Sequence, residues 1–392
     1  MTNESLAVQL HSLVIFRNLL QNPVLKKLDT LLTVSPNDKF LLADAYGSFV
    51  AELFARSTDW SQFLMDAVLE DENLYIRAFC QNSSVDPALQ QCLDRELAFL
   101  QQLSFFSSEQ VPFENKLANW HTHSIDFAGT YHQRLEDLPR RGYGIFARYH
   151  VFTVHEGELV PVRHPDPQSL SELSGYEQER GKVIANTRAL LAGKPASNVL
   201  LYGDAGTGKS STVKAIANEF APEGLRLIEV KKAQLYQIPD IVERLSINPL
   251  KFILFIDDLS FSSNDNDFAA LKAILEGSVS SRGKNLAIYA TSNRRHLIKE
   301  SFADRDGDEI HLADTMQELL SLSARFGLTV TFSRPDKTLY EHIVENLALL
   351  YDIDVPKDRL MTQAEAFALR AGGRSPRTAK QFIEQLKAQE AN

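Results

Sequence analysis

The sequence predicts an α/β fold built on a five-stranded parallel sheet, with mainly helical regions before and after it. Three observations support this prediction. Short apolar strands alternate with helices between residues 169 and 334, a glycine-rich turn joins the first strand to a helix, and the flanking regions space their apolar residues at helical intervals. Apolar strands that alternate with helices are typical of a parallel sheet covered on both faces.

The elements of the sheet region follow one another in a regular order. The expected strands are 198–202, 225–230, 252–257, 285–291 and 328–332. The helices expected between them are 209–220, 232–245, 267–278 and 315–324. Folds of this kind bind ligands at the carboxyl ends of their strands. Polar residues that follow the strands are therefore the candidates for function.

The turn after the first strand reads Gly-Asp-Ala-Gly-Thr-Gly-Lys-Ser and satisfies the pattern G-x-x-x-x-G-K-[ST]. Its glycines let the backbone wrap around phosphates, which successive N–H groups and the start of the next helix attract. We expect Lys209 to reach the β and γ phosphates and the Ser210 hydroxyl to ligate Mg²⁺. The residues expected to hold the nucleotide are Gly203, Asp204, Ala205, Gly206, Thr207, Gly208, Lys209, Ser210 and Ser211.

Two further strands end in polar residues. The apolar run 252–256 is followed by Asp257 and Asp258, and the run 286–290 by Thr291-Ser292-Asn293. We expect Asp257 to hold Mg²⁺ and Asp258 to polarise the attacking water, although an aspartate here can also cap a turn or helix. Asn293 would lie between the other strand ends and orient the water or bind the γ phosphate. Asparagine alone also favours turns, so its order after the other motifs is what supports this role.

Four regions are expected along the chain. Residues 1–140 form a helical N-terminal domain, and residues 141–168 form a bridge containing a strand at 143–154 and a possible hairpin. Residues 169–334 form the α/β domain, and residues 335–392 a helical lid of three helices. The stiff segment His164-Pro165-Asp166-Pro167 marks the boundary, because it can continue neither a strand nor a helix.

Composition and charge limit the classes of function. The net charge is −10, and residues 1–160 hold 12 Lys or Arg against 20 Asp or Glu, so a nucleic-acid partner is possible but not indicated. Two cysteines fit neither a disulfide framework nor a zinc site, which favours a reducing compartment. No apolar run reaches the length of a membrane span and no leader pattern is visible, so we expect a cytoplasmic protein that does not contact the membrane.

The order of these motifs resembles an AAA+ ATPase module over roughly residues 167–386. Beside the three strand-end motifs, the resemblance rests on Arg325-Phe326-Gly327 before the last strand and Gly373-Arg374-Ser375-Pro376-Arg377 in the lid. It implies that Asn293 is a first sensor of the γ phosphate and Arg377 a second one. It also implies that Arg325 is a finger reaching a neighbouring subunit's nucleotide, with Arg294, Arg295 and Arg374 as competitors for the arginine roles. Gly175 and Tyr176 would lie near the adenine.

A narrower resemblance rests on the segments GYEQER, FIDDLSF, YATSNRRHL and LSARFGLTVTF. Together they resemble an uncharacterised bacterial AAA+ family with an ATP-binding domain of unknown function and a helical N-terminal region. Among characterised proteins, the paired aspartates look most like the helicase-loader and replication-initiator clade. Most AAA+ machines have Asp-Glu where this chain has Asp257-Asp258, and the shorter side chain implies slow hydrolysis.

The expected function is Mg²⁺-dependent ATP hydrolysis at a site between subunits of a homo-oligomer, driving the switching, remodelling or loading of an unknown protein partner through the N-terminal helical domain. Guanine is disfavoured because no N/TKxD-like segment follows the fourth strand. A nucleotide-gated scaffold with negligible hydrolysis is the alternative. A phosphotransferase is a third class, against which the sensor and finger arginines argue.

Overall fold

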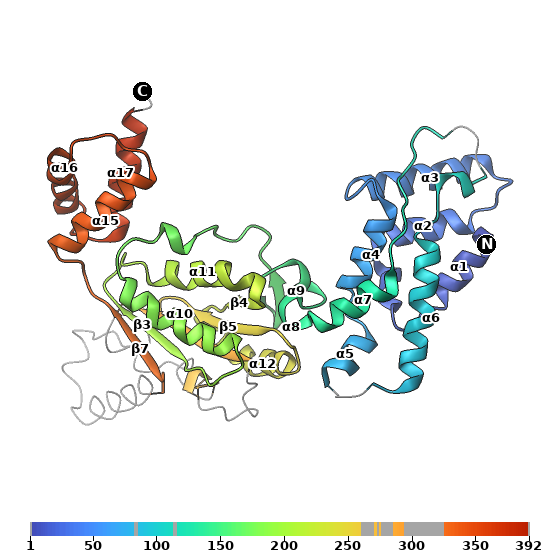
Figure 1. Ribbon diagram of the computed structural model, residues 1–392, viewed down its shortest axis with the longest axis horizontal. Helices are drawn as coiled ribbons and strands as arrows, with labels where there is room; N and C mark the ends of the chain where they lie inside the picture. The colour runs from blue at the N-terminus through green and yellow to red at the C-terminus, as the bar shows by residue number, and fades with distance from the viewer. Residues whose placement is uncertain are drawn as a thin grey trace. The chain divides into compact units, whose positions relative to one another are not determined.

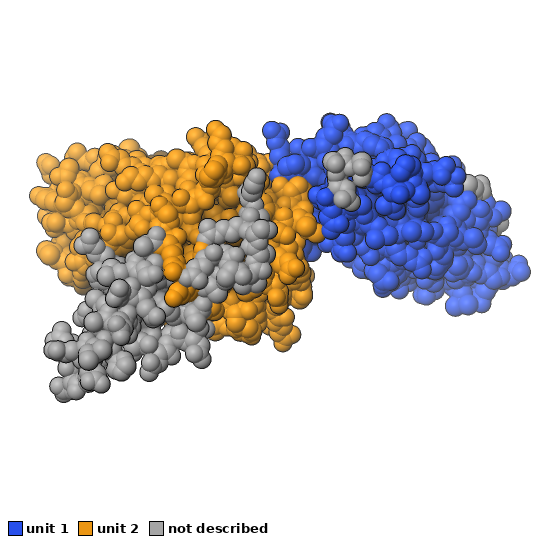
Figure 2. Space-filling model, turned by 90° about the horizontal axis from the view of Figure 1, so that it is seen from below, with its two compact units in different colours: residues 1–148 blue, residues 149–392 orange. Residues whose placement is uncertain are grey.

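The computed structural model describes residues 2–81, 85–112, 116–259, 270–272, 274–275, 285–293 and 325–390. The chain divides into two compact units, residues 1–148 and residues 149–392, which Figure 2 colours blue and orange. Among the described helices, none combines the length and the apolar content that crossing a membrane requires.

The first unit is helical. Its α-helices are α1 (Asn3–His11), α2 (Pro23–Thr33), α3 (Lys39–Phe54), α4 (Trp60–Glu70), α5 (Leu74–Gln81), α6 (Pro87–Leu103), α7 (Phe127–Glu136), α8 (Leu138–Arg141) and α9 (Ile145–Arg148), with 3₁₀ turns η1 (Arg17–Gln21) and η2 (Ser108–Gln110). Side chains cap many of these helices, as Asp38, Asp59 and Asp126 do for α3, α4 and α7 by accepting a backbone N–H of the first turn. The apolar faces then close around one core.

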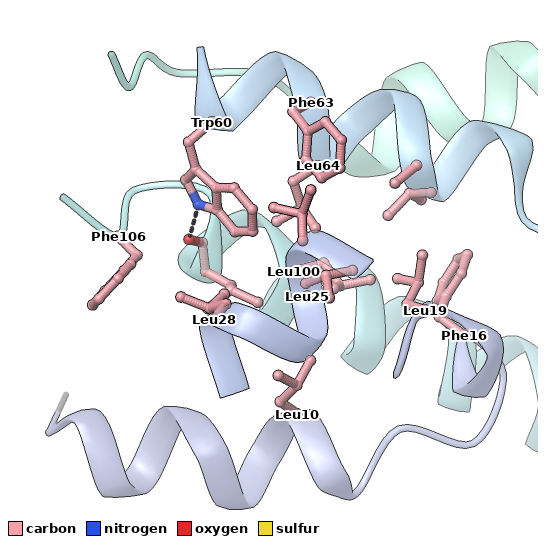
Figure 3. Packing of buried hydrophobic residues seen from close by; sticks show 14 of the residues in the cluster. Leu10, Phe16, Leu19, Leu25, Leu28, Trp60, Phe63, Leu64, Leu100 and Phe106 are labelled. Carbon is pink, nitrogen blue, oxygen red and sulfur yellow. Dashed lines mark hydrogen bonds between the residues drawn. The ribbon is translucent and has the colours of Figure 1, made fainter. Parts of the chain in front are cut away.

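Aromatic and leucine side chains fill that core (Figure 3). Trp60 is fully buried, and its indole N–H donates to the Leu103 carbonyl at 2.9 Å, so its polar atom is satisfied without water. Trp120 does the same with the Phe106 carbonyl at 2.7 Å. Both tryptophans of the chain therefore lie in the first unit.

The second unit is a seven-stranded sheet with helices (Figure 1). Its strands are β1 (Val151–His155), β2 (Glu158–Pro161), β3 (Val199–Gly203), β4 (Leu225–Glu229), β5 (Lys251–Ile256), β6 (Leu286–Ser292) and β7 (Leu328–Phe332). Their order is β2-β1-β4-β5-β6-β3-β7, and every neighbouring pair is parallel except β1 and β2. The predicted α/β class and parallel sheet are confirmed.

The predicted count of five strands is wrong, because a hairpin extends the sheet. β1 pairs in parallel with β4 and antiparallel with β2, so both strands join the edge beyond β4. The sequence analysis assigned this hairpin to a bridge at residues 141–168. The strand expected at 143–154 is also shorter than predicted: Gly142 and Gly144 have positive φ, α9 follows, and only residues 151–155 are extended.

The helices of the second unit flank the sheet or form a lid. They are α10 (Glu177–Leu191), α11 (Lys209–Phe220), α12 (Ile238–Ser246), α15 (Lys337–Leu350), α16 (Lys357–Arg370) and α17 (Pro376–Glu390), with 3₁₀ turns η3 (Leu170–Glu172), η4 (Ala221–Glu223) and η5 (Lys232–Gln237). The helices α15, α16 and α17 form the lid, and side chains of the lid and of the sheet share one buried cluster. The helices expected at 267–278 and 315–324 lie outside the described residues, apart from short pieces of the first.

Candidate nucleotide-binding site

The glycine-rich loop follows β3, the strand next to the edge strand β7. It connects β3 to α11, and β3 lies between β6 and β7, the strands that follow later in the chain. In parallel sheets, ligands bind where successive connections leave a strand in opposite directions. The loop therefore occupies the position in this sheet that is best suited to a ligand.

Close packing of the loop against β7 requires glycine at position 203. Its φ is +136°, and a Cβ built on it would lie 2.0 Å from the Phe332 carbonyl oxygen of β7. No side chain tolerates that approach. The loop is thus held against the end of β7, and the backbone N–H of Asp204 donates to the same carbonyl at 3.1 Å.

Lys209 begins α11 and is almost fully buried. Its Nζ donates to the carbonyls of Gly203 at 2.9 Å and Asp204 at 2.7 Å, and to Asn293 Oδ1 at 3.1 Å. Burial lowers its pKa from the ordinary lysine value, since the charged form loses solvation. The ammonium group is therefore folded back onto the loop, within reach of any phosphate bound there.

Ser210, Asp257 and Thr291 meet beside the loop. The Ser210 hydroxyl donates to Asp257 Oδ1 at 2.6 Å, and the Thr291 hydroxyl donates to the same oxygen at 2.5 Å. Hydroxyl and carboxylate oxygens are the ligands that Mg²⁺ prefers, usually together with phosphate oxygens and water. This donor set fits the Mg²⁺ expected from the sequence. Among the described residues, no group of three or more His, Cys, Asp or Glu side chains could hold a metal alone.

Asp258 and Asn293 are joined by a hydrogen bond. Asn293 Nδ2 donates to Asp258 Oδ1 at 2.8 Å, while its Oδ1 accepts from Lys209. Asp258 has a φ of +52°, an uncommon conformation for a residue other than glycine, and its N–H donates to the Thr291 hydroxyl at 2.9 Å. Asn293 therefore connects the lysine of the loop to the carboxylate expected to polarise water.

These residues line a cleft of about 790 Å³ between the loop and the lid. Ala205 to Ser211, Asp257, Asp258 and Asn293 form one side. Arg377 and Lys380 of α17 face them, and the backbone N–H of Arg377 donates to the Gly206 carbonyl at 3.2 Å. The rest of the lining mixes polar residues, such as Glu172 and Arg180, with apolar side chains from Leu173, Ile343, Leu347, Leu350 and Tyr351. The volume suits a nucleotide, with charged groups for phosphates and apolar side chains for a base.

Five residues expected in the site do not line this cleft: Gly203, Asp204, Gly175, Tyr176 and Arg325. Tyr176 is buried, packs its ring on Phe332, and lines a separate cleft of about 410 Å³. Arg374, a competitor for the arginine roles, is bound to the Glu365 carboxylate at 2.5 Å and 3.0 Å. Arg294 and Arg295 lie outside the described residues.

Arg325 lies near the amino end of β7, whereas the glycine-rich loop follows the carboxyl end of the neighbouring strand β3. It precedes β7, whose first residue Leu328 is in register with Val199, the first residue of β3. The loop instead follows the last residue of β3. Five residues of strand span about 16 Å, so Arg325 is far from the cleft of its own chain.

The sequence analysis gave no role to several residues of the cleft. Thr291 was read only as part of a strand-end motif, although its hydroxyl contacts both Asp257 and Asp258. Arg180 lines the cleft and donates to the Leu173 carbonyl at 2.8 Å. Leu347 and Tyr351 carried no signal, because apolar residues at helical spacing resemble any buried face of a helix.

Curated proteins resemble part of the chain. The replication factor C large subunit of Sulfolobus acidocaldarius is 31% identical over 116 residues, which cover 28% of this chain and 26% of that protein. The replication factor C large subunit of Thermofilum pendens is 30% identical over 129 residues, 30% of each chain. The present chain thus spans less than a third of the length of these relatives.

Solved structures of RuvB from Thermotoga maritima also match. A RuvB mutant is 19% identical with a TM-score of 0.37, covering 56% of this chain and 64% of that chain. The RuvB Holliday junction branch migration motor is 17% identical with a TM-score of 0.33, covering 57% and 72%.

The site and the sequence relatives agree on the class of the second unit. The loop, the two strand-end motifs and the parallel sheet form an AAA+ ATPase module, as the replication factor C relatives also indicate. The family model described as "Protein of unknown function (DUF815)" matches residues 146–390, and the chain belongs to that family.

Proposed function

We propose that this protein binds ATP with Mg²⁺ in the cleft between the glycine-rich loop and the lid, and hydrolyses it to switch the conformation of the module. The observation that carries the proposal is the convergence of Lys209, Asp257 and Asn293 on one end of this cleft. Mg²⁺ supplies charge neutralisation at the phosphate oxygens when it is bound. Ser210 and Asp257 would hold it.

The side chains already present define what each would do in the reaction. The Lys209 ammonium group would replace its hydrogen bonds to the loop carbonyls by hydrogen bonds to the β and γ phosphates. Arg377 of the lid would bind the γ phosphate. Asp258 would orient the attacking water and accept its proton. The Asp258 carboxylate accepts a hydrogen bond from Asn293, so a γ phosphate that draws Asn293 away would free Asp258 to act.

We further propose that the complete site needs a second copy of the chain. Arg325 lies near the amino ends of the strands, and the loop of its own chain lies at their carboxyl ends. An arginine finger role for Arg325 therefore requires the nucleotide bound by a neighbouring subunit. A homo-oligomer in which one face carries the loop and the other carries Arg325 would complete every site in the same way.

The switch would act on a protein partner through the helical unit of residues 1–148. Nucleic acid is the weaker candidate, because residues 1–160 carry an excess of acidic side chains. The two free cysteines favour the reducing cytoplasm as the compartment. A nucleotide-gated scaffold remains the second candidate, favoured by the hydrogen bond that holds Asp258 to Asn293.

Phosphate release from ATP by the wild type, Lys209→Ala and Asp258→Asn tests the chemistry. We expect Lys209→Ala to lose ATP binding, and Asp258→Asn to bind ATP but to hydrolyse it about 100-fold more slowly. Wild-type turnover equal to that of both variants would leave the scaffold as the function. Transfer of phosphate to an acceptor other than water would point instead to a phosphotransferase.

Mixing two inactive variants tests the oligomer. Arg325→Ala keeps Lys209, and Lys209→Ala keeps Arg325, so a mixed assembly contains some sites with both residues intact. We expect the mixture to hydrolyse ATP faster than either variant alone. Exposed Arg370 in the lid provides the control, since Arg370→Ala should behave as wild type. A mixture as inactive as its parts would refute the finger role of Arg325.

A further inference from the structure

The segment 333–336 connects the sheet to the lid, and we call it the hinge. It joins the end of β7 to the start of α15, whose first turn is capped by Asp336 accepting the Leu339 N–H at 2.8 Å. Whatever fixes this short segment fixes the direction in which the lid leaves the sheet. Two residues that the sequence analysis expected near the nucleotide, Asp204 and Tyr176, contact this segment.

Asp204 reaches the hinge from the glycine-rich loop. Its Oδ2 accepts the backbone N–H of Arg334 at 2.8 Å, and its own N–H donates to the Phe332 carbonyl at 3.1 Å. Asp204 therefore bonds to the chain on both sides of Ser333. Its carboxylate is directed away from the phosphate cradle, where a negative charge would repel the ligand.

Tyr176 reaches the hinge from the segment before α10. Its hydroxyl donates to the Ser333 carbonyl at 2.6 Å, and its ring packs on Phe332 with 5.3 Å between centroids. Tyr176 adopts a φ of +60°, a conformation that costs a residue other than glycine about 1 kcal/mol. Such a conformation persists only where surrounding contacts offset that cost. Here the side chain is 6% exposed and both its ring and its hydroxyl have partners.

The residues beside these two extend the contact to the lid itself. A Cβ built on Gly175 would lie 3.0 Å from Ile343 Cδ1 of α15, so the backbone at Gly175 packs directly on the lid. A Cβ on Gly373, in the loop between α16 and α17, would lie 2.9 Å from Arg334 Nη1. Arg334 thus contacts the glycine-rich loop with its backbone and the lid with its guanidinium group.

We infer that Asp204 and Tyr176 are positioning residues that fix the sheet–lid hinge, and that Asp204 passes a change in the phosphate-binding loop directly to the lid. The second part rests on the proposed function, because it needs a phosphate to move the loop. The first part does not. Asp204 is the only one of the loop's residues 204–208 whose side chain is shown bonding to the hinge.

Lid position in the nucleotide-free protein tests the first part. Spin labels at Glu219→Cys on α11 and Leu369→Cys on α16, both exposed positions, report the sheet–lid distance by double electron–electron resonance. Cys80 and Cys92 are replaced by serine in this background. We expect Asp204→Ala and Tyr176→Phe to broaden the distance distribution. Asp204→Asn should restore it, because an amide oxygen also accepts the Arg334 N–H.

Matched measurements separate positioning from loss of folding. Asp354→Ala removes an exposed carboxylate in the loop between α15 and α16 and should leave the distribution unchanged. Far-UV circular dichroism should show the same helical content for all variants. A wild-type distribution in Asp204→Ala, or a distribution in Asp204→Asn as broad as in Asp204→Ala, would overturn the inference.

Nucleotide binding tests the second part. ATP added to the wild type should narrow the distribution, and Asp204→Ala should raise the Kd for ATP about 5- to 10-fold while Asp204→Asn stays within about twofold. An equal Kd for wild type and Asp204→Ala would overturn the coupling. If the wild type itself does not bind ATP, the proposed function fails, while the nucleotide-free distances still decide the role of the hinge contacts.

Discussion

We expect Thr291→Val to lower both the stability of the second unit and its rate of ATP hydrolysis. Thr291 is 2% exposed on β6, in register with Leu201 of β3, so valine fits the same space. The hydroxyl that it removes has two partners: it donates to Asp257 Oδ1 at 2.5 Å and accepts the Asp258 N–H at 2.9 Å. The change therefore removes hydrogen bonds without creating a cavity.

The two losses are similar in size. Asp257 and Asp258 are both exposed residues, and both hydrogen bonds to the Thr291 hydroxyl are partly buried. A hydrogen bond of this kind contributes about 0.5–1.5 kcal/mol to stability. Asp258 also has a positive φ that this bond helps to hold. We expect Thr291→Val to lower the free energy of unfolding of the second unit by about 2 kcal/mol.

The same substitution should reduce hydrolysis. Losing the Thr291 contact lets Asp257 and Asp258 shift relative to the loop, and a displacement of about 1 Å at a reacting group can cost about 100-fold in rate. We expect kcat to fall at least about 10-fold. Thr291→Ser keeps the hydroxyl and should retain most of the activity, losing about 1 kcal/mol of stability with the methyl group.

Urea unfolding followed by circular dichroism and by tryptophan fluorescence measures the effect. Trp60 and Trp120 both belong to the first unit, so fluorescence follows that unit and provides an internal control. Thr329→Val, at an exposed position of β7, should change stability by less than about 0.5 kcal/mol. If Thr291→Val were as stable and as active as Thr329→Val, the hydroxyl would not organise the two carboxylates and the reasoning would be refuted.

Three other predictions concern single positions. Gly203→Ala should destabilise the second unit by about 2–4 kcal/mol, because its Cβ meets the Phe332 carbonyl, whereas Gly181→Ala in open space within α10 should stabilise it by about 0.5–1 kcal/mol in the same urea titration. Glu96→Gln should destabilise the first unit by about 2–3 kcal/mol in tryptophan-monitored unfolding, because Glu96 accepts three successive backbone N–H groups at 2.7–3.1 Å and a glutamine NH₂ cannot. Burial raises the pKa of Asp71 from 3.8 to about 6, so the native state keeps a proton that the unfolded chain releases, and the stability of the first unit should fall by about 2–3 kcal/mol between about pH 4 and about pH 6. Tryptophan-monitored unfolding of Asp71→Asn should lack this part of the pH dependence, and a profile identical to that of the wild type would contradict the assignment.

The parts of the site that could be predicted from the sequence are those in which the local chain dictates the geometry. Gly203 and Gly208 allow a loop that other residues cannot form, and a lysine after such a loop starts the next helix at the same place. Asp257 and Asn293 follow buried strands, and parallel strands bring their carboxyl ends to one edge. Sequence patterns report such geometry because only a few residues determine it.

The parts that could not be predicted depend on contacts between distant segments. β1 becomes a sheet strand by pairing with β4, more than 70 residues further along the chain, and no pattern within residues 151–155 indicates that partner. Tyr176 was expected near adenine, but its direction is set by the positive φ and by Phe332 and Ser333 of the hinge. Its placement follows from tertiary packing, which a motif of six residues does not encode.

The glycine-rich loop shows why a motif predicts a backbone better than it predicts side chains. Phosphate recognition at the four variable positions of G-x-x-x-x-G-K-[ST] uses backbone N–H groups, so the side chains there are free to make other contacts. In this chain the Thr207 hydroxyl donates to the Asp204 carbonyl at 2.8 Å, and the Asp204 carboxylate accepts from the hinge. The loop is therefore bonded internally and to the hinge through side chains at the positions that the motif leaves open. In the proposed mechanism, Asp204 at a variable position provides the coupling to the lid, while the glycines and lysine of the motif provide phosphate binding.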